Sequence, residues 1–306
     1  MGQKKRFDID CVWNASTQLG EGVVWVESEA SVYFVDVIGK KIFRYNLETQ
    51  SKTEWTTPKD PTFIFPTTQK LFLCGMEDGL YWFDTQRGTF FYWLSVEEDF
   101  KQVRLNDGYV DERGNLWFGT MDRAAKHPKG ALYFLQWMEG KPSIKIMDRD
   151  YVITNGPLIS EQHKKLFHNH SNARLMYQFD IESSGGLTNK KIFAVIDKGH
   201  PDGMTIDEKD NIWVCLYGGH QVRVYSLEGK FVQSFEIPCP NVTKIAFGGK
   251  EYRTAFVTTA IKGLSPEEQS QYPQAGSLFS FQVETPGRKQ NKFNVPCQIN
   301  LKKQIF

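Results

Sequence analysis

Short apolar and aromatic runs, each bounded by charged or Gly/Asn-rich turns, recur along the chain. Each run contains an apolar–aromatic pair, and the marker aromatics of these pairs are Tyr33, Phe72, Trp117, Phe167, Trp213 and Phe256. Their separations are 39, 45, 50, 46 and 43 residues. A second aromatic run follows each marker, at residues 41–45, 79–83, 131–134, 174–177, 221–225 and 277–281. Runs of this length between turn residues predict short β-strands that pair as hairpins.

The regular spacing of these hairpins predicts the fold. A four-stranded propeller blade takes roughly 40–50 residues, and six such units fill the chain of 306 residues. We therefore expect an all-β protein, a six-bladed β-propeller with four antiparallel strands per blade. It should form a single domain over residues 1–306 and close its ring near the termini. A two-sheet sandwich is the alternative, but a sandwich does not require six near-equal repeats.

Polar residues recur at a nearly constant offset before the marker aromatics. Those at offsets of 12, 11, 12, 11 and 13 residues are Glu21, Asn106, Asn155, Asp202 and Thr243, and the second repeat has no clear counterpart near Thr62. If each begins the innermost strand of a blade, the side chains meet at one mouth of the channel. Carboxylate and amide oxygens suit a hard divalent cation, and the adjacent glycines allow close backbone approach. Taken alone, each Asn-Gly or Asp-Gly pair is more typical of an ordinary turn, and it is the common offset across four repeats that favours a shared site.

Composition narrows the class of protein. Hydrophobic residues make up 40% and charged residues 24%, which is typical of a globular protein with a sizeable core. The net charge is +1 and no basic stripe carries interleaved aromatics, so we expect no nucleic-acid partner. Neither a signal-peptide region nor an apolar run of the ~18 residues that span a bilayer is visible, so we expect no membrane contact. The five widely spaced cysteines favour a reducing, cytoplasmic location.

Seven segments carry a family resemblance. They are Leu19–Gly22, Arg104–Gly108, Gly114–Met121, Asn155–Gly156, Pro201–Asp207, Tyr217–Gly219 and Ala246–Gly249, in order through nearly the whole chain. In this set the chain resembles the senescence marker protein (regucalcin), gluconolactonase and luciferin-regenerating enzyme family. The resemblance implies a six-bladed propeller with one divalent metal ion, often Ca²⁺ or Zn²⁺, and the hydrolysis of small-molecule sugar lactones. An all-oxygen ligand set also suits Mg²⁺ or Mn²⁺.

The resemblance also implies roles for individual residues. Glu21, Asn155 and Asp202 correspond to the metal ligands of the family, and Arg104 and Asn106 correspond to its substrate-contacting pair. We interpret Asp202 as catalytic too, because a carboxylate there can take a proton from the attacking water. Arg104 could instead be a structural arginine that pairs with a neighbouring acid.

Four positions depart from the family pattern. Val23 stands where proline is usual, Ala124 where some members carry a substrate-contacting glutamate, and Pro157 begins an altered segment. His170 stands in place of a usual aspartate and could line the pocket mouth as a substrate contact. For His170 and its neighbour His168, an ordinary polar strand position is the simpler interpretation. These departures preserve the metal and put the substrate in question.

Two alternatives to a metal-dependent lactonase stay open. One is a catalytically silent metal-binding propeller, a calcium-binding or interaction module, since a fold alone does not prove activity. The other is an esterase that acts on a non-sugar ester, which aromatics near the presumed mouth, such as Phe63 and Phe65, would favour. The oligomeric state is open as well.

Overall fold

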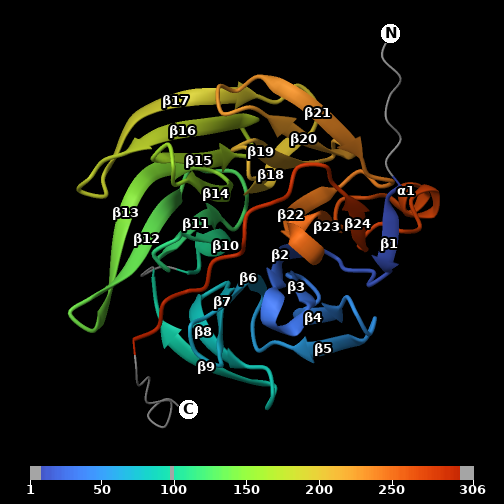
Figure 1. The fold of residues 1–306 in the computed structure, drawn as a ribbon, viewed down its shortest axis with the longest axis horizontal. Coiled ribbons are helices and arrows are strands. Elements are labelled where there is room, and N and C mark those ends of the chain that lie inside the picture. The colour runs from blue at the N-terminus through green and yellow to red at the C-terminus, as the bar shows by residue number, and fades with distance from the viewer. Residues whose placement is uncertain (1–7, 97–99, 297–306) are drawn as a thin grey trace.

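Six four-stranded sheets stand around a central channel in the computed structural model, which describes residues 8–96 and 100–296 (Figure 1). Neighbouring strands within the sheets pair antiparallel. The predicted all-β, six-bladed propeller is therefore confirmed. Within the described ranges, the six-residue α1 (Pro266–Gln271) is the only α-helix, and no helix is long and apolar enough to cross a membrane.

The strands follow the chain from the channel outward in the first five blades. Blade one holds β2 (Gly20–Val26), β3 (Ser31–Asp36), β4 (Lys41–Asn46) and β5 (Lys52–Thr56). Blade two holds β6 (Pro61–Pro66), β7 (Phe72–Met76), β8 (Gly79–Asp84) and β9 (Thr89–Leu94). Blade three holds β10 (Val103–Val110), β11 (Leu116–Asp122), β12 (Gly130–Met138) and β13 (Lys141–Tyr151). Blade four holds β14 (Thr154–Ser160), β15 (Lys165–His170), β16 (Leu175–Ile181) and β17 (Leu187–Val195). Blade five holds β18 (His200–Ile206), β19 (Ile212–Tyr217), β20 (Gln221–Tyr225) and β21 (Phe231–Glu236).

Blade six closes the ring from both ends of the chain. Its inner strands are β22 (Val242–Gly248), β23 (Thr254–Thr259) and β24 (Leu278–Gln282), and its outer strand is β1 (Asp10–Trp13). In this pair Asp10 lies opposite Ser280, and Cys11 lies opposite Phe279. Ring closure near the termini was predicted and is found, because the first strand of the chain completes the last sheet (Figure 1).

The marker aromatics form the contacts between neighbouring blades. All six lie on the second strand of their blade with exposed fractions of 0–5%. Tyr33 of blade one packs on Phe72 of blade two with ring centroids 4.7 Å apart. On the other side of blade one, Trp25 stacks on Phe256 of blade six at 5.9 Å. The repeat in the sequence therefore reflects the repeated core between blades, where large aromatic side chains are buried away from water.

An aspartate at the turn between the first two strands holds the indole of the next strand in blades three and five. Asp207 accepts hydrogen bonds from the backbone N–H groups of Lys209 and Asn211 and from Nε1 of Trp213 (3.0 Å). Asp111 is bonded in the same way to Nε1 of Trp117 (3.1 Å). These turns are therefore tied to the core and do not merely reverse the chain.

We expect Asp207→Ala to lower the free energy of unfolding by about 2–3 kcal/mol, because it leaves the buried Trp213 N–H and two turn amides without an acceptor. Urea denaturation followed by tryptophan fluorescence measures this loss. Asp84→Ala is the control, because Asp84 caps a surface turn at the N–H groups of Gln86 and Arg87 and holds no indole. Its cost should stay below about 1 kcal/mol. Equal losses for the two variants would contradict the assigned role.

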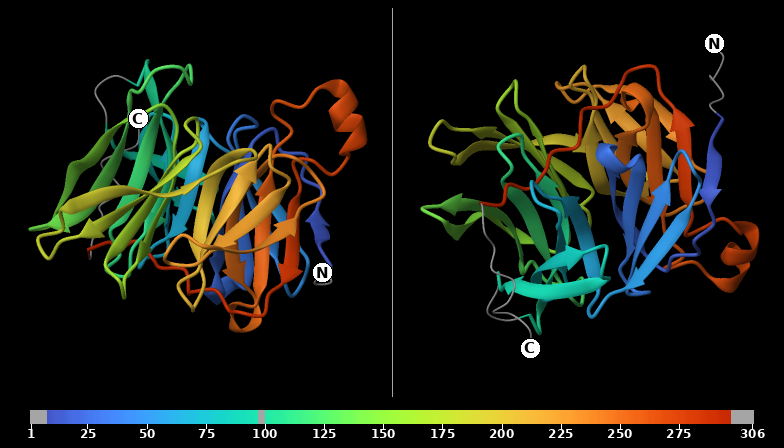
Figure 2. Two further views of the ribbon diagram at one scale, coloured as in Figure 1. Left: turned by 90° about the horizontal axis from the view of Figure 1, so that it is seen from above. Right: turned by 60° about the horizontal axis from the view of Figure 1, so that its bottom comes forward.

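The segment 284–296, which we call the strap, crosses the lower face of the ring. Figure 1 shows this red segment passing over the centre, and Figure 2 shows it on the face opposite α1. Its backbone bonds to blades two, three, five and six: Phe293 N–H to Pro66 O, Asn294 N–H to Gly114 O, Arg288 N–H to Ile206 O and Gly287 N–H to Tyr252 O. The strap was not predicted. It covers the lower end of the channel and leaves the upper end as the approach for a small molecule.

Candidate active site

The four strongest polar positions of the sequence pattern meet in one cavity. Glu21 on β2, Asn106 on β10, Asn155 on β14 and Asp202 on β18 line a cavity of about 240 Å³ at the upper end of the channel. Arg104 lines it as well. A cavity of this size suits a small ligand. The fifth position, Thr243, does not line it and donates instead to Gly20 O at 2.6 Å.

Bulges in the innermost strands aim these side chains into the channel. In each of the four blades the pairing register shifts at the polar residue, between Glu21 and Val24, Leu105 and Gly108, Asn155 and Leu158, or Pro201 and Met204. A bulge adds an unpaired residue and redirects its side chain. Gly22 and Gly156 take φ values of +58° and +52° at these points, which favour glycine. The glycine pairs thus belong to bulged strands rather than to hairpin turns.

The side-chain oxygens in the cavity differ in the hydrogen bonds that they accept. Asn106 Nδ2 donates to Asn155 Oδ1 at 2.7 Å, and Asn155 Nδ2 donates to Ser171 Oγ at 2.9 Å. The Gly22 N–H donates weakly to Glu21 Oε2 at 3.3 Å. Asp202 is 6% exposed, and its Oδ1 is buried with no hydrogen-bond partner among the described residues. An orphaned buried carboxylate oxygen is free to accept a ligand such as a cation or a water molecule.

Burial and mutual repulsion make the two carboxylates costly as anions. Burial raises the pKa of Glu21 to about 8, with the charge of Asp107 as the second cause. Burial also raises the pKa of Asp202 well above its usual value, with Glu21 as the next cause. A cation between these carboxylates would relieve both effects. In the described ranges no group of three or more His, Cys, Asp or Glu side chains is placed to hold a metal. The candidate set is instead two carboxylates with the Asn155 amide.

A buried ion pair lies in the channel beside this set. Lys244 Nζ contacts Asp107 Oδ1 at 2.7 Å and Oδ2 at 2.6 Å, and both side chains are buried. The Gly108 and Gly156 N–H groups also donate to Asp107, each at 2.8 Å. Sequence reasoning missed this pair, because Asp107 stood out only as part of an Asn-Asp-Gly segment and nothing marks Lys244.

Arg104 is anchored toward the cavity and not to an acid. Its Nη1 donates to Leu105 O and to Asn106 Oδ1, each at 2.9 Å, and no carboxylate of the described chain forms an ion pair with it. Burial lowers its pKa to about 10, with repulsion from Arg123 as the second cause. The interpretation of Arg104 as one half of a structural ion pair therefore finds no support.

The family model described as "SMP-30/Gluconolactonase/LRE-like region" matches residues 19–261. That stretch contains every residue predicted for the site. The chain belongs to this family.

Relatives match the chain over most of its length. The protein named "Putative sugar lactone lactonase YvrE" of Bacillus subtilis is 29% identical over 287 residues, 91% of this chain and 97% of the relative. Regucalcin of Oryctolagus cuniculus is 30% identical over 280 residues, 89% of this chain and 93% of the relative. The crystal structure of regucalcin from Agrobacterium tumefaciens, described as a calcium-binding protein, superposes with a TM-score of 0.89 at 23% identity. It covers 95% of this chain and 98% of its own.

The departures from the pattern of the SMP-30/gluconolactonase/LRE-like family lie outside the cavity. None of Val23, Ala124, Pro157 and His170 lines it. The structure does not bring His170 to the pocket mouth, because its Nε2 accepts the Val152 N–H at 3.1 Å.

Several lining residues of this family member were not predicted: Ser171, Asn172, His200, Tyr217 and Lys262. The residues that follow His170 thus take the place expected of it. The aromatics that favoured an esterase, Phe63 and Phe65, are 1% and 4% exposed and do not line the cavity either. Tyr217 had been noted only as the start of a matching segment, and Lys262 carries no motif.

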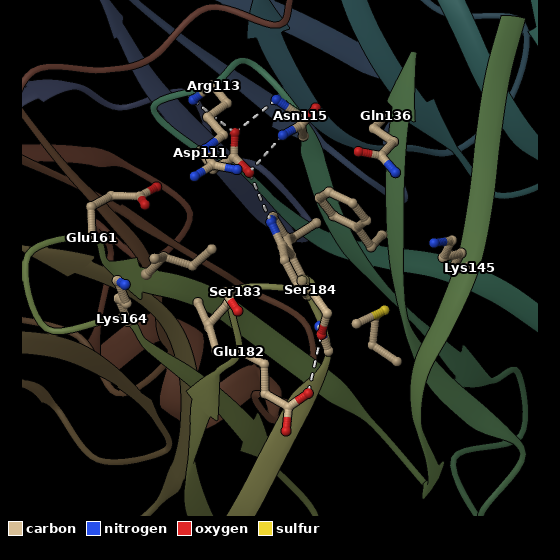
Figure 3. Close-up of a pocket in the computed structure, with 17 residues that line it drawn as sticks. Asp111, Arg113, Asn115, Gln136, Lys145, Glu161, Lys164, Glu182, Ser183 and Ser184 are labelled. Carbon is tan, nitrogen blue, oxygen red and sulfur yellow. Dashed lines mark hydrogen bonds between the residues drawn. The ribbon is translucent and has the colours of Figure 1, made fainter. Parts of the chain in front are cut away.

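A larger cavity of about 650 Å³ in this family member lies between blades three and four (Figure 3). Its labelled Asp111 already accepts bonds from Arg113 N–H, Asn115 N–H and Trp117 Nε1. Glu161, also on its wall, accepts the Glu112 N–H at 3.1 Å. Since these carboxylates are already engaged and no predicted site residue lines this cavity, we place the candidate site in the smaller, axial one.

Proposed function

We propose that the chain is a divalent-metal-dependent hydrolase that opens sugar lactones, in the manner of a gluconolactonase. The observation that carries this proposal is the convergence of Glu21, Asn155 and Asp202 with Arg104 in one axial cavity. Membership of a lactonase-containing family and a relative named as a sugar lactone lactonase support the choice of reaction.

Glu21, Asn155 and Asp202 would hold the metal ion. The orphaned Asp202 Oδ1 and the repulsion between the two carboxylates support a cation at this point. The donors are all oxygens, which suits Ca²⁺, Mg²⁺ or Mn²⁺, and Zn²⁺ accepts carboxylates too. When bound, a divalent ion acts as a Lewis acid that stabilises negative charge on the lactone carbonyl oxygen.

The residues of the chain handle the proton and the orientation of the substrate. Hydrolysis forms a bond from the water oxygen to the lactone carbonyl carbon and breaks the bond from that carbon to the ring oxygen. Asp202 takes the proton that the water loses and returns it to the ring oxygen, which becomes a hydroxyl of the open acid. Arg104 keeps guanidinium donors for the sugar hydroxyls or the new carboxylate, since only its Nη1 donates to residues in the described ranges. Asn106 fixes Asn155 through the bond between their amides.

A panel of neutral sugar lactones and aryl esters, each assayed with Ca²⁺, Zn²⁺, Mg²⁺ and Mn²⁺, tests the proposed reaction. We expect lactone turnover that is lost in chelator and restored by metal. Metal binding without any turnover would instead support a silent metal-binding propeller. Turnover of aryl esters alone would support an esterase.

Replacing Arg104 separates substrate binding from metal binding. We expect Arg104→Ala to lower kcat/KM for a lactone by about 10–100-fold, the value of one hydrogen-bonded charge. Metal affinity, measured by calorimetry, should stay within about twofold. Arg113→Ala removes the same charge at the other cavity, between blades three and four, and is the matched control. An Arg104 variant with full lactone activity would overturn the assignment.

A further inference from the structure

Lys262 lines the axial cavity, and its ammonium group has no partner among the described residues. Its backbone is held by three bonds: its N–H donates to Gln18 O, and its carbonyl accepts from Asn241 Nδ2 and from the Tyr217 hydroxyl. The side chain lines the cavity and is exposed, and no described residue forms a hydrogen bond or ion pair with its Nζ. A lysine on an anchored backbone that faces a ligand cavity without a partner is available to bind an anion.

The charges around the cavity show why an anion is required. The lining carries two carboxylates, Glu21 and Asp202, and two cationic side chains, Arg104 and Lys262. Further charges near the lining are already paired: the buried Asp107 with Lys244 at 2.6 Å, and the more exposed Arg123 with Glu77 at 2.7 Å. With both carboxylates ionised, as a bound cation would keep them, the charges of the four lining side chains cancel. A divalent cation would leave two positive charges in excess.

One new carboxylate does not neutralise that excess. Ring opening of a neutral lactone produces a single carboxylate, so one positive charge would remain in a partly buried cavity. Uncompensated charge is costly where water is restricted. Burial lowers the pKa of Lys262, and repulsion from Arg104 is the second cause, so these two cationic side chains lie near enough to act on one ligand together.

We propose that the preferred substrate carries an anionic group of its own, a carboxylate or a phosphate, and that Lys262 binds it with Arg104 beside it. This inference rests on the proposed lactonase function and names its substrate class. The two anionic groups share the chemistry that an ammonium and a guanidinium recognise.

Two readouts test the inference. The first is the ratio of kcat/KM for an anionic lactone over a neutral one, with glucarolactone and 6-phosphogluconolactone against glucono-δ-lactone. The second is equilibrium binding of the open acids, glucarate and 6-phosphogluconate against gluconate, by calorimetry on metal-loaded protein. We expect the wild type to favour at least one anionic class about tenfold or more in both readouts. The class that is favoured identifies the group as carboxylate or phosphate.

Variants decide whether Lys262 is responsible. Lys262→Gln should abolish the preference and Lys262→Arg should keep most of it. Lys126→Gln is the charge-matched control, because Lys126 is exposed and does not line the cavity. A wild type that does not discriminate in binding, or a Lys262→Gln variant that still does, would overturn the inference. If no lactone is turned over with any metal, the proposed function fails, while the binding readout still tests the anion preference.

Discussion

Asp202→Asn is expected to lower lactone kcat by about 10²–10⁴-fold at saturating metal, the usual contribution of a positioned general base. Asparagine keeps the shape and one oxygen but cannot take a proton from water. The fold should be kept, because Asn169 Nδ2 bonds to the backbone carbonyl of Asp202 (2.7 Å), which the substitution leaves in place. Steady-state kinetics across a metal titration give kcat and metal affinity separately.

The same variant should respond differently to metal in a melting experiment. Wild-type protein should gain more stability from added metal than Asp202→Asn, because ligand binding to the folded state raises its melting temperature. In chelator the difference in melting temperature between the wild type and Asp202→Asn should become smaller or change sign. The substitution removes one of two buried carboxylates that repel each other. Thr205→Ser, on the same strand, is the control and should match the wild type in both experiments. Full activity of Asp202→Asn would show that Asp202 only shapes the bulge.

The fold was predictable because its core repeats in the sequence. Tyr33, Trp117 and Trp213 occupy equivalent places between blades, so the spacing of large buried aromatics reports the blade length directly. The strap and α1 could not be found in this way, because neither repeats. The strap is held by isolated backbone bonds to several blades, such as Phe293 N–H to Pro66 O, and such contacts leave no periodic trace.

The cavity lining was predictable only where the repeat itself supplies it. Glu21, Asn155 and Asp202 stand at equivalent bulges in the innermost strands of blades one, four and five, so a nearly constant offset from the marker aromatic found them together. Lys262 lies outside this pattern, in the segment between β23 and α1, and its place follows from backbone bonds to distant residues. His170 was expected in the lining from its position in the family pattern alone. The next residue along the chain, Ser171, lines the cavity instead.

Lys244→Met is expected to destabilise the metal-free protein by about 3–5 kcal/mol, because it leaves the buried Asp107 carboxylate without its counter-charge. The melting temperature in chelator should fall on the order of 5–10 °C. Methionine preserves most of the aliphatic stem, which packs so closely on Gly203 that a Cβ there would lie 2.1 Å from Lys244 Cδ. The loss is therefore a test of charge rather than of volume.

Two further variants isolate the charge. Lys41→Met breaks the exposed pair with Glu54 (2.8 Å) and should cost less than about 1 kcal/mol. The double variant Lys244→Met/Asp107→Asn removes both buried charges and should recover much of the lost stability, whereas an equal loss would assign the effect to packing.

Metal affinity should rise while stability falls, because the positive charge of Lys244 acts on both Glu21 and Asp202. Lys244→Met should therefore bind a divalent ion more tightly than the wild type by calorimetry, and added metal should restore more of its melting temperature. Weaker metal binding by this variant would mean that the pair maintains the shape of the site instead of setting its charge.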